Sequence, residues 1–234
     1  MKANFAFAAL VAAAYAYDNS VPIYGSNPGW IEGKGKAGIK VEIFLDLLCS
    51  DCKAENPVWE QLLEQPFLDG SVYDYFTFSF TVFPLPYHYM SFEVNQLISF
   101  FMDECTVNST KCGLASQYKD FAFANQSTIL GMKDDSKDWF TQWWSTQVAN
   151  EFGYDFDTIY GLYDRSTDAH QTFNNTRYFW KYACQKKVSG TPTAFINGVM
   201  LDSVPRTVDG WLRDLESIYN SQYAHSNQAM EFLS

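Results

Sequence analysis

The sequence of 234 residues predicts an α/β fold that carries an all-helical insertion, and three observations lead to this prediction. A β-branched and apolar run over residues 40–48 predicts a strand, and the helix-compatible segment 52–64 follows it. A second pair of strands is predicted over residues 194–201, around a two-residue turn. About 108 residues separate Pro84, at the end of another strand-like run, from Pro192, and this long interval has the pattern of helices.

The first strand ends at a pair of cysteines, Cys49 and Cys52. The order of strand, Cys-x-x-Cys and helix is typical of a redox site, because the amides and the positive end of a helix N-terminus stabilise a thiolate. Cys49 is therefore the predicted nucleophile, and Cys52 can attack the mixed disulfide that Cys49 forms. Pro57 is expected to kink the helix that follows.

The second strand pair begins directly after Thr191-Pro192, and a proline is tolerated where it opens a strand. Asn197-Gly198 predicts a tight hairpin turn between residues 194–196 and 199–201. A cis bond before Pro192 has a small energetic cost, and an ordinary trans turn is the alternative.

Taken together, these motifs resemble the DsbA-like branch of the thioredoxin superfamily, in which a helical domain is inserted into a thioredoxin fold. The resemblance implies a central mixed sheet flanked by helices, and a cis-proline loop that faces the cysteines. Thr191 and Pro192 would then bind the substrate strand. The implied domains are the first half of the thioredoxin domain over 17–85, the helical insertion over 86–187 and the second half over 188–234.

Two apolar stripes at helical spacing support the insertion. Their members are Val94, Leu97, Ile98 and Phe101 in the first, and Phe140, Trp143, Trp144 and Gln147 or Val148 in the second. Trp139, Trp143 and Trp144 are expected to pack in the core between the insertion and the thioredoxin base. The segment 83–89 also resembles a Pro-Tyr-His segment of eukaryotic DsbA-like proteins.

One departure from related oxidoreductases concerns a buried acid, which they usually carry six positions before the first cysteine. That position is Ile43 here, and Glu42 is one residue out of phase. Since side chains alternate along a strand, Glu42 should point away from Ile43. Asp46 is the better candidate for a carboxylate near the cysteines.

A second departure is the dipeptide Ser50-Asp51, where strong oxidases of the family carry proline and histidine. With Asp46, these residues are the expected modulators of Cys49. The negative charge of Asp51 should raise the pKa of Cys49. A less stabilised thiolate gives a less oxidising disulfide, so we predict a more reducing potential than that of DsbA-like oxidases.

The N-terminus has the pattern of a secretory signal peptide over residues 1–16, with cleavage expected after Ala16. A membrane anchor is the alternative, but the apolar stretch is shorter than the roughly twenty residues that a spanning helix needs. Three Asn-x-Ser/Thr sequons, at Asn108, Asn125 and Asn174, fit passage through a secretory pathway. Without a Lys-Asp-Glu-Leu-type ending, secretion or an endomembrane lumen is the expected destination.

Three further cysteines lie outside the motif. Cys105 and Cys112 flank a polar stretch, and in a secreted protein they are expected to form a structural disulfide. The alternative is a second redox pair. Cys184 is left over, either as a buried unpaired thiol or as a residue near the active site.

Charge and composition exclude several classes of protein. A net charge of -11 argues against nucleic-acid binding, which needs a basic surface. Neither a glycine-rich phosphate loop nor a cofactor motif is present, and no cofactor is expected. Zinc is not expected either, because His88, His170 and His225 are isolated from one another. For His88, a surface or hydrogen-bonded structural role is favoured over a role in a cleft.

The sequence thus predicts a thiol-disulfide oxidoreductase of the secretory pathway, with protein or peptide thiols and disulfides as partners and no membrane partner after signal cleavage. Compartment and partners set the direction of exchange. A second hypothesis is a peptide-binding or chaperone module in which Cys49 and Cys52 form a structural disulfide. A third is a kappa-type glutathione transferase, which shares this fold.

Overall fold

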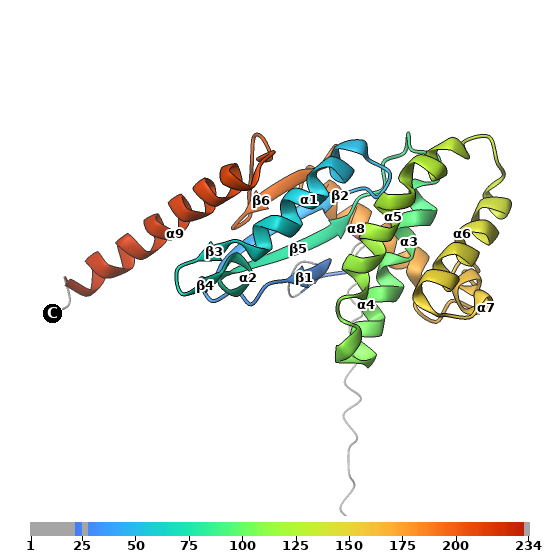
Figure 1. Ribbon diagram of the computed structural model, residues 1–234, viewed down its shortest axis with the longest axis horizontal. Coiled ribbons are helices and arrows are strands. Elements are labelled where there is room, and N and C mark those ends of the chain that lie inside the picture. Colours follow the sequence, from blue (N-terminus) through green and yellow to red (C-terminus); the bar gives the residue numbers. More distant parts are fainter. Residues whose placement is uncertain (1–21, 25–27, 232–234) are drawn as a thin grey trace, which may run out of the picture.

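The computed structural model describes residues 22–24 and 28–231, and its centre is a five-stranded sheet of order β1-β5-β2-β6-β7 (Figure 1). Strands β2 and β5 are parallel, whereas the other neighbours are antiparallel. This sheet confirms the predicted mixed architecture. The strands are β1 (Trp30–Glu32), β2 (Ile39–Leu45), β5 (Phe76–Val82), β6 (Thr193–Ile196) and β7 (Val199–Met200).

The predicted hairpin joins β6 to β7. Asn197 and Gly198 both have positive φ angles, of 48° and 82°, as a tight two-residue turn between twisted strands requires. The Asn197 side-chain oxygen also accepts a hydrogen bond from the backbone N–H of Lys40, at 2.9 Å. This bond fixes the hairpin against the start of β2.

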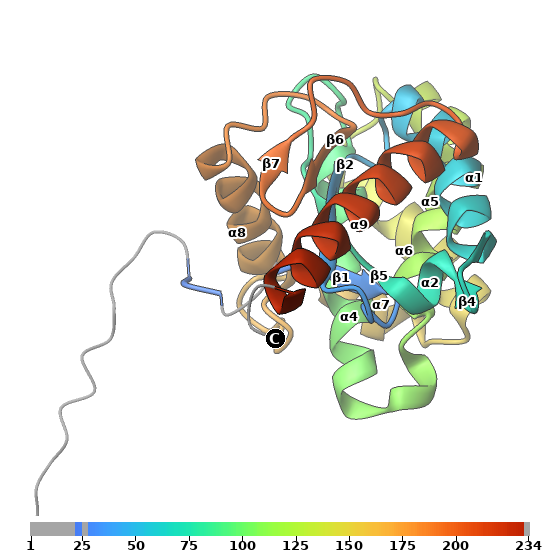
Figure 2. The ribbon, with the colours of Figure 1, turned by 90° about the vertical axis from the view of Figure 1, so that its left-hand side faces the viewer.

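Helices cover both faces of the sheet, with α1 (Ser50–Glu64) and α9 (Val208–Glu231) on one face and α8 (Thr172–Gln185) on the other (Figure 2). Phe80 of β5 contacts Trp59 of α1, with ring centroids 5.9 Å apart. On the opposite face, Phe44 of β2 lies 6.0 Å from Tyr182 of α8. Because β2 is covered on both sides, five of its seven residues are apolar, and the charged ones are Lys40 and Glu42.

Short elements connect α1 to β5. They are the two-stranded sheet of β3 (Pro66–Phe67) and β4 (Gly70–Ser71), followed by the single-turn helix α2 (Val72–Tyr75). Ser71 and Asp74 form a capping box at the start of α2, in which each side chain accepts a hydrogen bond from the other residue's backbone N–H. The chain therefore enters β5 from a well-defined turn.

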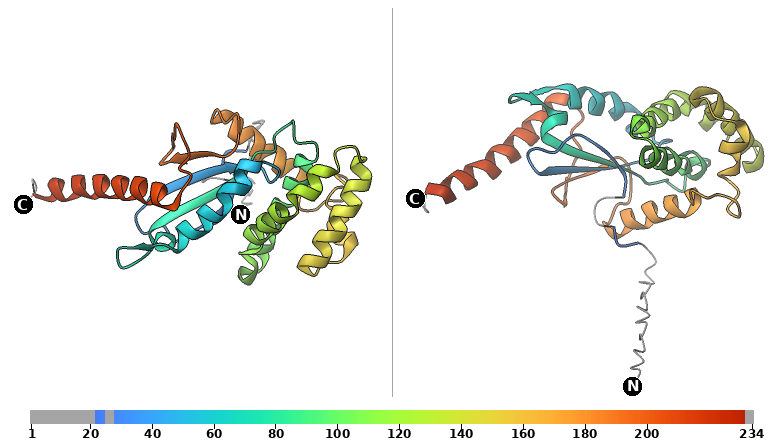
Figure 3. Two further views of the ribbon diagram at one scale, coloured as in Figure 1. Left: turned by 45° about the horizontal axis from the view of Figure 1, so that its top comes forward. Right: turned by 90° about the horizontal axis from the view of Figure 1, so that it is seen from below.

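A group of helices lies between β5 and β6 in the sequence and at one end of the sheet in space (Figures 1 and 3). The group consists of α3 (Ser91–Gln96), α4 (Ile98–Val107), the 3-10 helix η1 (Ser109–Lys111), α5 (Leu114–Gly131), α6 (Lys137–Phe152) and α7 (Phe156–Gly161), and the chain then continues into α8. Figure 3 shows that α9 extends away from the sheet at the other end of the molecule.

The insertion has its own aromatic core. Tyr118 of α5 is fully buried, donates a hydrogen bond to the carbonyl of Val94 at 2.6 Å, and accepts one from the indole of Trp144 at 2.9 Å. Trp144 is therefore buried in the core as expected, but its contact with Tyr118 lies within the insertion rather than between the insertion and the sheet domain. The expectation of core packing is wrong for Trp139. Trp139 is 48% exposed and stacks on Trp143, because it lies on the outer face of α6.

The first predicted stripe is buried, but it spans two helices. Val94 belongs to α3 and Ile98 to α4, and the chain bends at Leu97 between them. All three side chains are fully buried, so the apolar spacing predicted burial correctly without locating the break.

Among the described residues, none of the helices is long and apolar enough to cross a membrane. The predicted signal peptide, residues 1–16, lies outside the described residues.

Candidate active site

Cys49 is the N-cap of α1, at the point where the chain leaves the carboxyl end of β2. Its backbone N–H donates to the carbonyl of Asp46 at 3.0 Å, and its own carbonyl accepts from Lys53 in the first turn of the helix. The side chain is 6% exposed, whereas Cys52, one turn further along, is fully buried. The two thiols therefore share one helix end but differ in access.

The surroundings of Cys49 favour its thiolate. A hydrogen bond from the Cys52 thiol is the largest cause, interaction with Thr191 and the backbone amides of Cys52 and Asp51 adds to it, and burial opposes it. The result lowers the pKa of Cys49 to about 6. At neutral pH, Cys49 is thus mainly ionised, as a nucleophilic cysteine requires.

Cys52 has the opposite character. Burial raises its pKa well above the ordinary value, and the neighbouring Cys49 raises it further. At neutral pH, the Cys52 thiol therefore donates a hydrogen bond to the Cys49 thiolate, and the two sulfur atoms share one proton.

The Thr191-Pro192 peptide bond is cis, and the loop that carries it faces the cysteines. In the protonated form, the Cys49 thiol donates to the carbonyl oxygen of Thr191 at 3.3 Å. Thr193, the first residue of β6, donates its hydroxyl to the carbonyl of Gly190 at 2.8 Å and closes the loop. The structure therefore brings together four predicted site residues: Cys49, Cys52, Thr191 and Pro192.

Asp46 lies beneath this site and is fully buried. One carboxylate oxygen accepts from the Leu48 backbone N–H at 3.0 Å, the Ser91 hydroxyl at 2.6 Å and the Asn95 amide at 2.8 Å. The other accepts from the Leu85 backbone N–H at 3.1 Å. The carboxylate thus joins the turn before Cys49 to the loop after β5 and to α3.

His88 completes the set of groups around Asp46. Its Nδ1 lies 2.7 Å from the second carboxylate oxygen, and its side chain is 20% exposed. The hydrogen bond to Asp46 raises the pKa of His88, partial burial opposes this, and the negative charges of Asp46 and Cys49 raise it further. The raised pKa favours the protonated form of His88, and the contact to buried Asp46 fits the favoured prediction of a hydrogen-bonded structural histidine.

Two buried amides hold the turn itself. Gln126 of α5 donates to the carbonyl oxygens of Leu47 and Cys49, at 3.1 and 3.0 Å. Asn95 accepts from the Leu47 backbone N–H at 3.3 Å. The insertion thereby fixes the backbone on which the nucleophile is carried.

Asp51 does not act as predicted. Its side chain is 62% exposed and lies 3.8 Å from the guanidinium of Arg206, so solvent and a cation screen its charge. Its backbone amide, by contrast, helps to lower the pKa of Cys49. The expectation that the Ser50-Asp51 dipeptide raises this pKa is therefore wrong. Ser50, the first residue of α1, is exposed.

Glu42 and Ile43 do face opposite sides of the sheet. Ile43 is fully buried toward α1, whereas Glu42 forms an ion pair with Lys186 and accepts from the Tyr182 hydroxyl at 3.1 Å on α8. Glu42 therefore lies on the opposite face of the sheet from α1.

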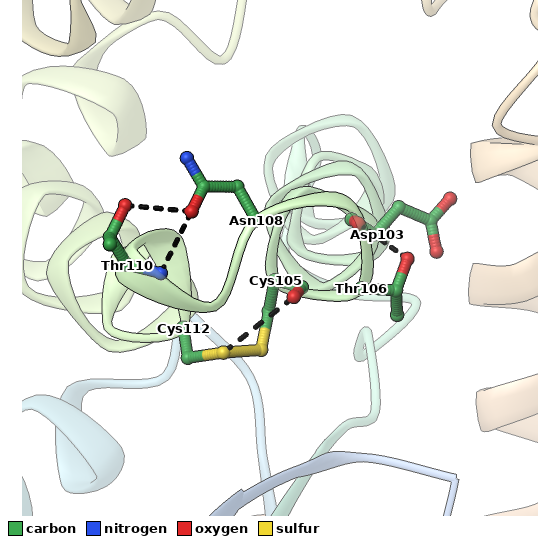
Figure 4. Close-up of a disulfide and its surroundings, with 6 residues drawn as sticks. All are labelled: Asp103, Cys105, Thr106, Asn108, Thr110 and Cys112. Atoms are coloured by element: carbon green, nitrogen blue, oxygen red, sulfur yellow. Dashed lines mark hydrogen bonds between the residues drawn. A yellow bond between two sulfur atoms is a disulfide. The ribbon is translucent and has the colours of Figure 1, made fainter.

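Cys105 and Cys112 are joined by a disulfide between the end of α4 and η1 (Figure 4). Asn108, between them, accepts from the backbone N–H and the hydroxyl of Thr110 at 3.0 and 2.9 Å. The disulfide and this cap order one helix-to-helix turn. Cys184 lies on α8 as a free and exposed thiol, so the expectation that it is buried is wrong.

The three sequons differ in their surroundings. Asn108 is exposed at the turn just described. Asn125 lies within α5, where its amide donates to the carbonyl of Phe121, and Asn174 lies within the first turn of α8. Thr176, the third residue of the last sequon, is fully buried.

Sequence reasoning missed Ser91, Asn95 and Gln126. The sequence around Asn95 and Gln126 does not mark them, because each stands directly beside another polar residue, Gln96 and Asn125 respectively. Buried polar side chains need partners, and here the partners are Asp46 and the turn before Cys49.

No protein-family model and no curated protein sequence matches this chain. Solved structures do match it. α-DsbA1 of Wolbachia pipientis superposes with a TM-score of 0.61 at 13% identity, over 88% of this chain and 96% of that one. Oxidised BdbD of Bacillus subtilis gives 0.54 at 18% identity, over 82% and 94%. MdbA of Actinomyces oris, a thiol-disulfide oxidoreductase, gives 0.51 at 16% identity, over 75% and 78%.

These identities are low, so the likeness shows the fold. The chain has the DsbA-like form of the thioredoxin fold, with a mixed sheet, flanking helices and a helical insertion.

Proposed function

We propose that this protein is a thiol-disulfide oxidoreductase that acts on cysteines of proteins or peptides through the Cys49–Cys52 couple. The asymmetry of the two thiols carries the proposal, because the pKa of Cys49 is lowered to about 6 while that of Cys52 is raised well above its ordinary value. A reactive outer thiol and a protonated inner thiol are what sequential exchange needs. The fold shared with a protein named as a thiol-disulfide oxidoreductase supports it.

In the reducing direction, the Cys49 thiolate attacks one sulfur of a substrate disulfide. A mixed disulfide forms, and the second substrate sulfur leaves as a thiolate that takes a proton. Cys52 then loses its proton and attacks the Cys49 sulfur, which releases the first substrate sulfur as a thiolate. Two electrons have passed to the substrate, and Cys49 and Cys52 are joined in a disulfide. In the oxidising direction, the same steps run in reverse.

The cis-proline loop would hold the substrate during these steps. The carbonyl oxygen of Thr191 lies 3.3 Å from the Cys49 sulfur, so backbone beside it is well placed to pair with an extended substrate strand. Pro192 lacks an N–H and fixes the loop next to the reacting sulfur.

The environment of the site supports an intermediate redox character. A pKa of about 6 for Cys49 lies between the values of about 7 in thioredoxin and about 3.5 in DsbA. Exchange in either direction is then controlled by the redox state of the partners.

We further propose that the protein acts in a eukaryotic secretory pathway, either secreted or in an endomembrane lumen. The signal-peptide pattern over residues 1–16, the exposed Asn108 sequon and the Pro-Tyr-His segment support this location. The disulfide between Cys105 and Cys112 is also suited to an oxidising compartment.

Trapping of substrates tests the proposed function. Reduced Cys52→Ser should accumulate mixed disulfides with a protein substrate, because the resolving thiol is missing, while Cys49→Ser should form none. The products are visible as bands on non-reducing gels that disappear with reductant. If neither variant differs from wild type, and the wild-type protein catalyses no exchange, the peptide-binding module with a structural disulfide becomes the better explanation.

A further inference from the structure

A second surface feature lies next to the site, on the side of the loop that follows β5. It is a pocket of about 340 Å³ between residues 84–89 and α8, with Phe92, Arg177 and Trp180 among its lining residues. We propose that this pocket, named here the Arg177 pocket, binds an acidic side chain of the substrate close to its reactive cysteine. The inference rests on the proposed function and assigns a substrate preference to it.

The walls of the Arg177 pocket are apolar and firmly held. Trp180 stacks on the buried ring of Phe83, with centroids 5.9 Å apart and planes within 13°. On the facing side, Pro84 and Pro86 restrict the backbone of the loop. Trp180 is 39% exposed and Tyr89 57% exposed, which leaves aromatic surface available to the stem of a bound side chain.

The charged residues of the Arg177 pocket indicate which kind of side chain it can bind. Arg177, His88 and Tyr89 are its charged or titratable lining residues, and no carboxylate lines it within the described part of the chain. Over the same residues, Arg177 forms no ion pair, and its guanidinium lies 5.7 Å from the centre of the Tyr178 ring. In a chain with a net charge of -11, an exposed arginine without a carboxylate partner is complementary to an acidic ligand.

His88 connects the Arg177 pocket to the nucleophile. Its ring lines the pocket, and its Nδ1 lies 2.7 Å from a carboxylate oxygen of Asp46, whose backbone carbonyl accepts a hydrogen bond from the Cys49 N–H at 3.0 Å. A substrate strand whose cysteine reacts at Cys49 therefore has a neighbouring residue within reach of the pocket. A carboxylate there would accept hydrogen bonds from the Arg177 guanidinium, and its methylene groups would lie on Trp180.

Matched peptides test this preference. Each peptide carries one cysteine as a mixed disulfide with 2-nitro-5-thiobenzoate, and Glu, Gln or Lys stands on one side of the cysteine or the other. The reduced protein supplies two electrons and releases the peptide thiol and the coloured thiolate, whose absorbance gives the rate. At low ionic strength we expect the Glu peptide to react about 3- to 5-fold faster than the Gln peptide in the better position, with the Lys peptide slowest.

Substitutions assign the preference to Arg177. Arg177→Gln should remove the difference between Glu and Gln, and Arg177→Glu should make the Lys peptide the fastest. Arg165→Gln is the matched control, because Arg165 is also an exposed arginine without an ion pair among the described residues, with its guanidinium over the Phe173 ring. This control should keep the wild-type order, and thermal unfolding should show that all variants are folded.

The experiment distinguishes refutation of the acidic preference from refutation of the proposed function. If wild type reacts with all three peptides at equal rates, or if Arg177→Glu keeps the order of wild type, the acidic preference is wrong while exchange stands. If no peptide reacts even though Cys49 is reduced, the proposed function itself is refuted.

Discussion

The hydrogen bond from Cys52 is the largest cause of the lowered pKa of Cys49, and removing its donor should have a measurable effect. A hydrogen bond to a charged group contributes about 1.5–3 kcal/mol, which corresponds to about 1–2 pKa units. Cys52→Ala should therefore raise the pKa of Cys49 from about 6 to about 7–8. Cys52→Ser keeps a donor at the same position, so its Cys49 should titrate close to wild type.

The assay is the rate of alkylation by iodoacetamide as a function of pH, in a Cys184→Ser background. With Cys105 and Cys112 in a disulfide and Cys184 removed, Cys49 is the accessible thiol in the described chain. If Cys52→Ala titrates near pH 6 like wild type, Thr191 and the helix amides suffice for the stabilisation, and the reasoning about Cys52 is refuted.

Three other substitutions test the buried support of the site. His88→Gln removes a group whose protonated form stabilises the Cys49 thiolate, so the alkylation profile should move to higher pH; an unmoved profile would contradict this. The wild-type protein should also lose stability as the pH rises, and His88→Gln should not. Because the pKa of His88 is raised in the folded state, its interaction with Asp46 contributes fully to stability below about pH 6.5, and this contribution is lost as the pH rises through the folded-state pKa. Asp46→Asn should lower the free energy of unfolding by about 3 kcal/mol in urea titrations, because the four hydrogen-bond donors and His88 would no longer face a buried carboxylate. A loss below about 1 kcal/mol would argue against a stabilising role for the hydrogen bonds around Asp46. Gln126→Ala should cost about 1–2 kcal/mol, and an unchanged urea midpoint would show that its two carbonyl partners are satisfied otherwise.

Local patterns predicted the parts of the fold that local physics determines. The Asn197-Gly198 turn needs two positive φ angles, and few other residue pairs adopt them, so the hairpin followed from two residues. Likewise, Cys49 follows an apolar strand and precedes a helix, which places it at a helix N-terminus whatever surrounds it.

The remainder depends on contacts between distant residues. Asp46 and His88 are 42 positions apart, and neither residue alone indicates the other as its partner. The charge of Asp51 was misjudged for a related reason, because its effect depends on which way the side chain points and on Arg206 from a loop far along the chain. Trp139 was assigned to the core because helical spacing identifies residues that share one face of a helix, but it does not show whether another element covers that face.

The reduction potential of the Cys49–Cys52 couple tests the central claim most directly. At pH 7, a thiolate with a pKa of about 6 stabilises the dithiol about tenfold, and each tenfold change is worth about 30 mV. Scaled from thioredoxin and DsbA by thiolate stabilisation alone, the potential should lie between about -250 and -190 mV. Titration in graded glutathione buffers, with alkylation of Cys49 as the readout, measures it.

A reversible transition in that range would support a working thiol-disulfide oxidoreductase that is more reducing than DsbA. A potential near -120 mV would contradict the account of the Cys49 thiolate. A bond that resists reduction until the protein unfolds would contradict the catalytic role altogether, and would favour a structural disulfide between Cys49 and Cys52.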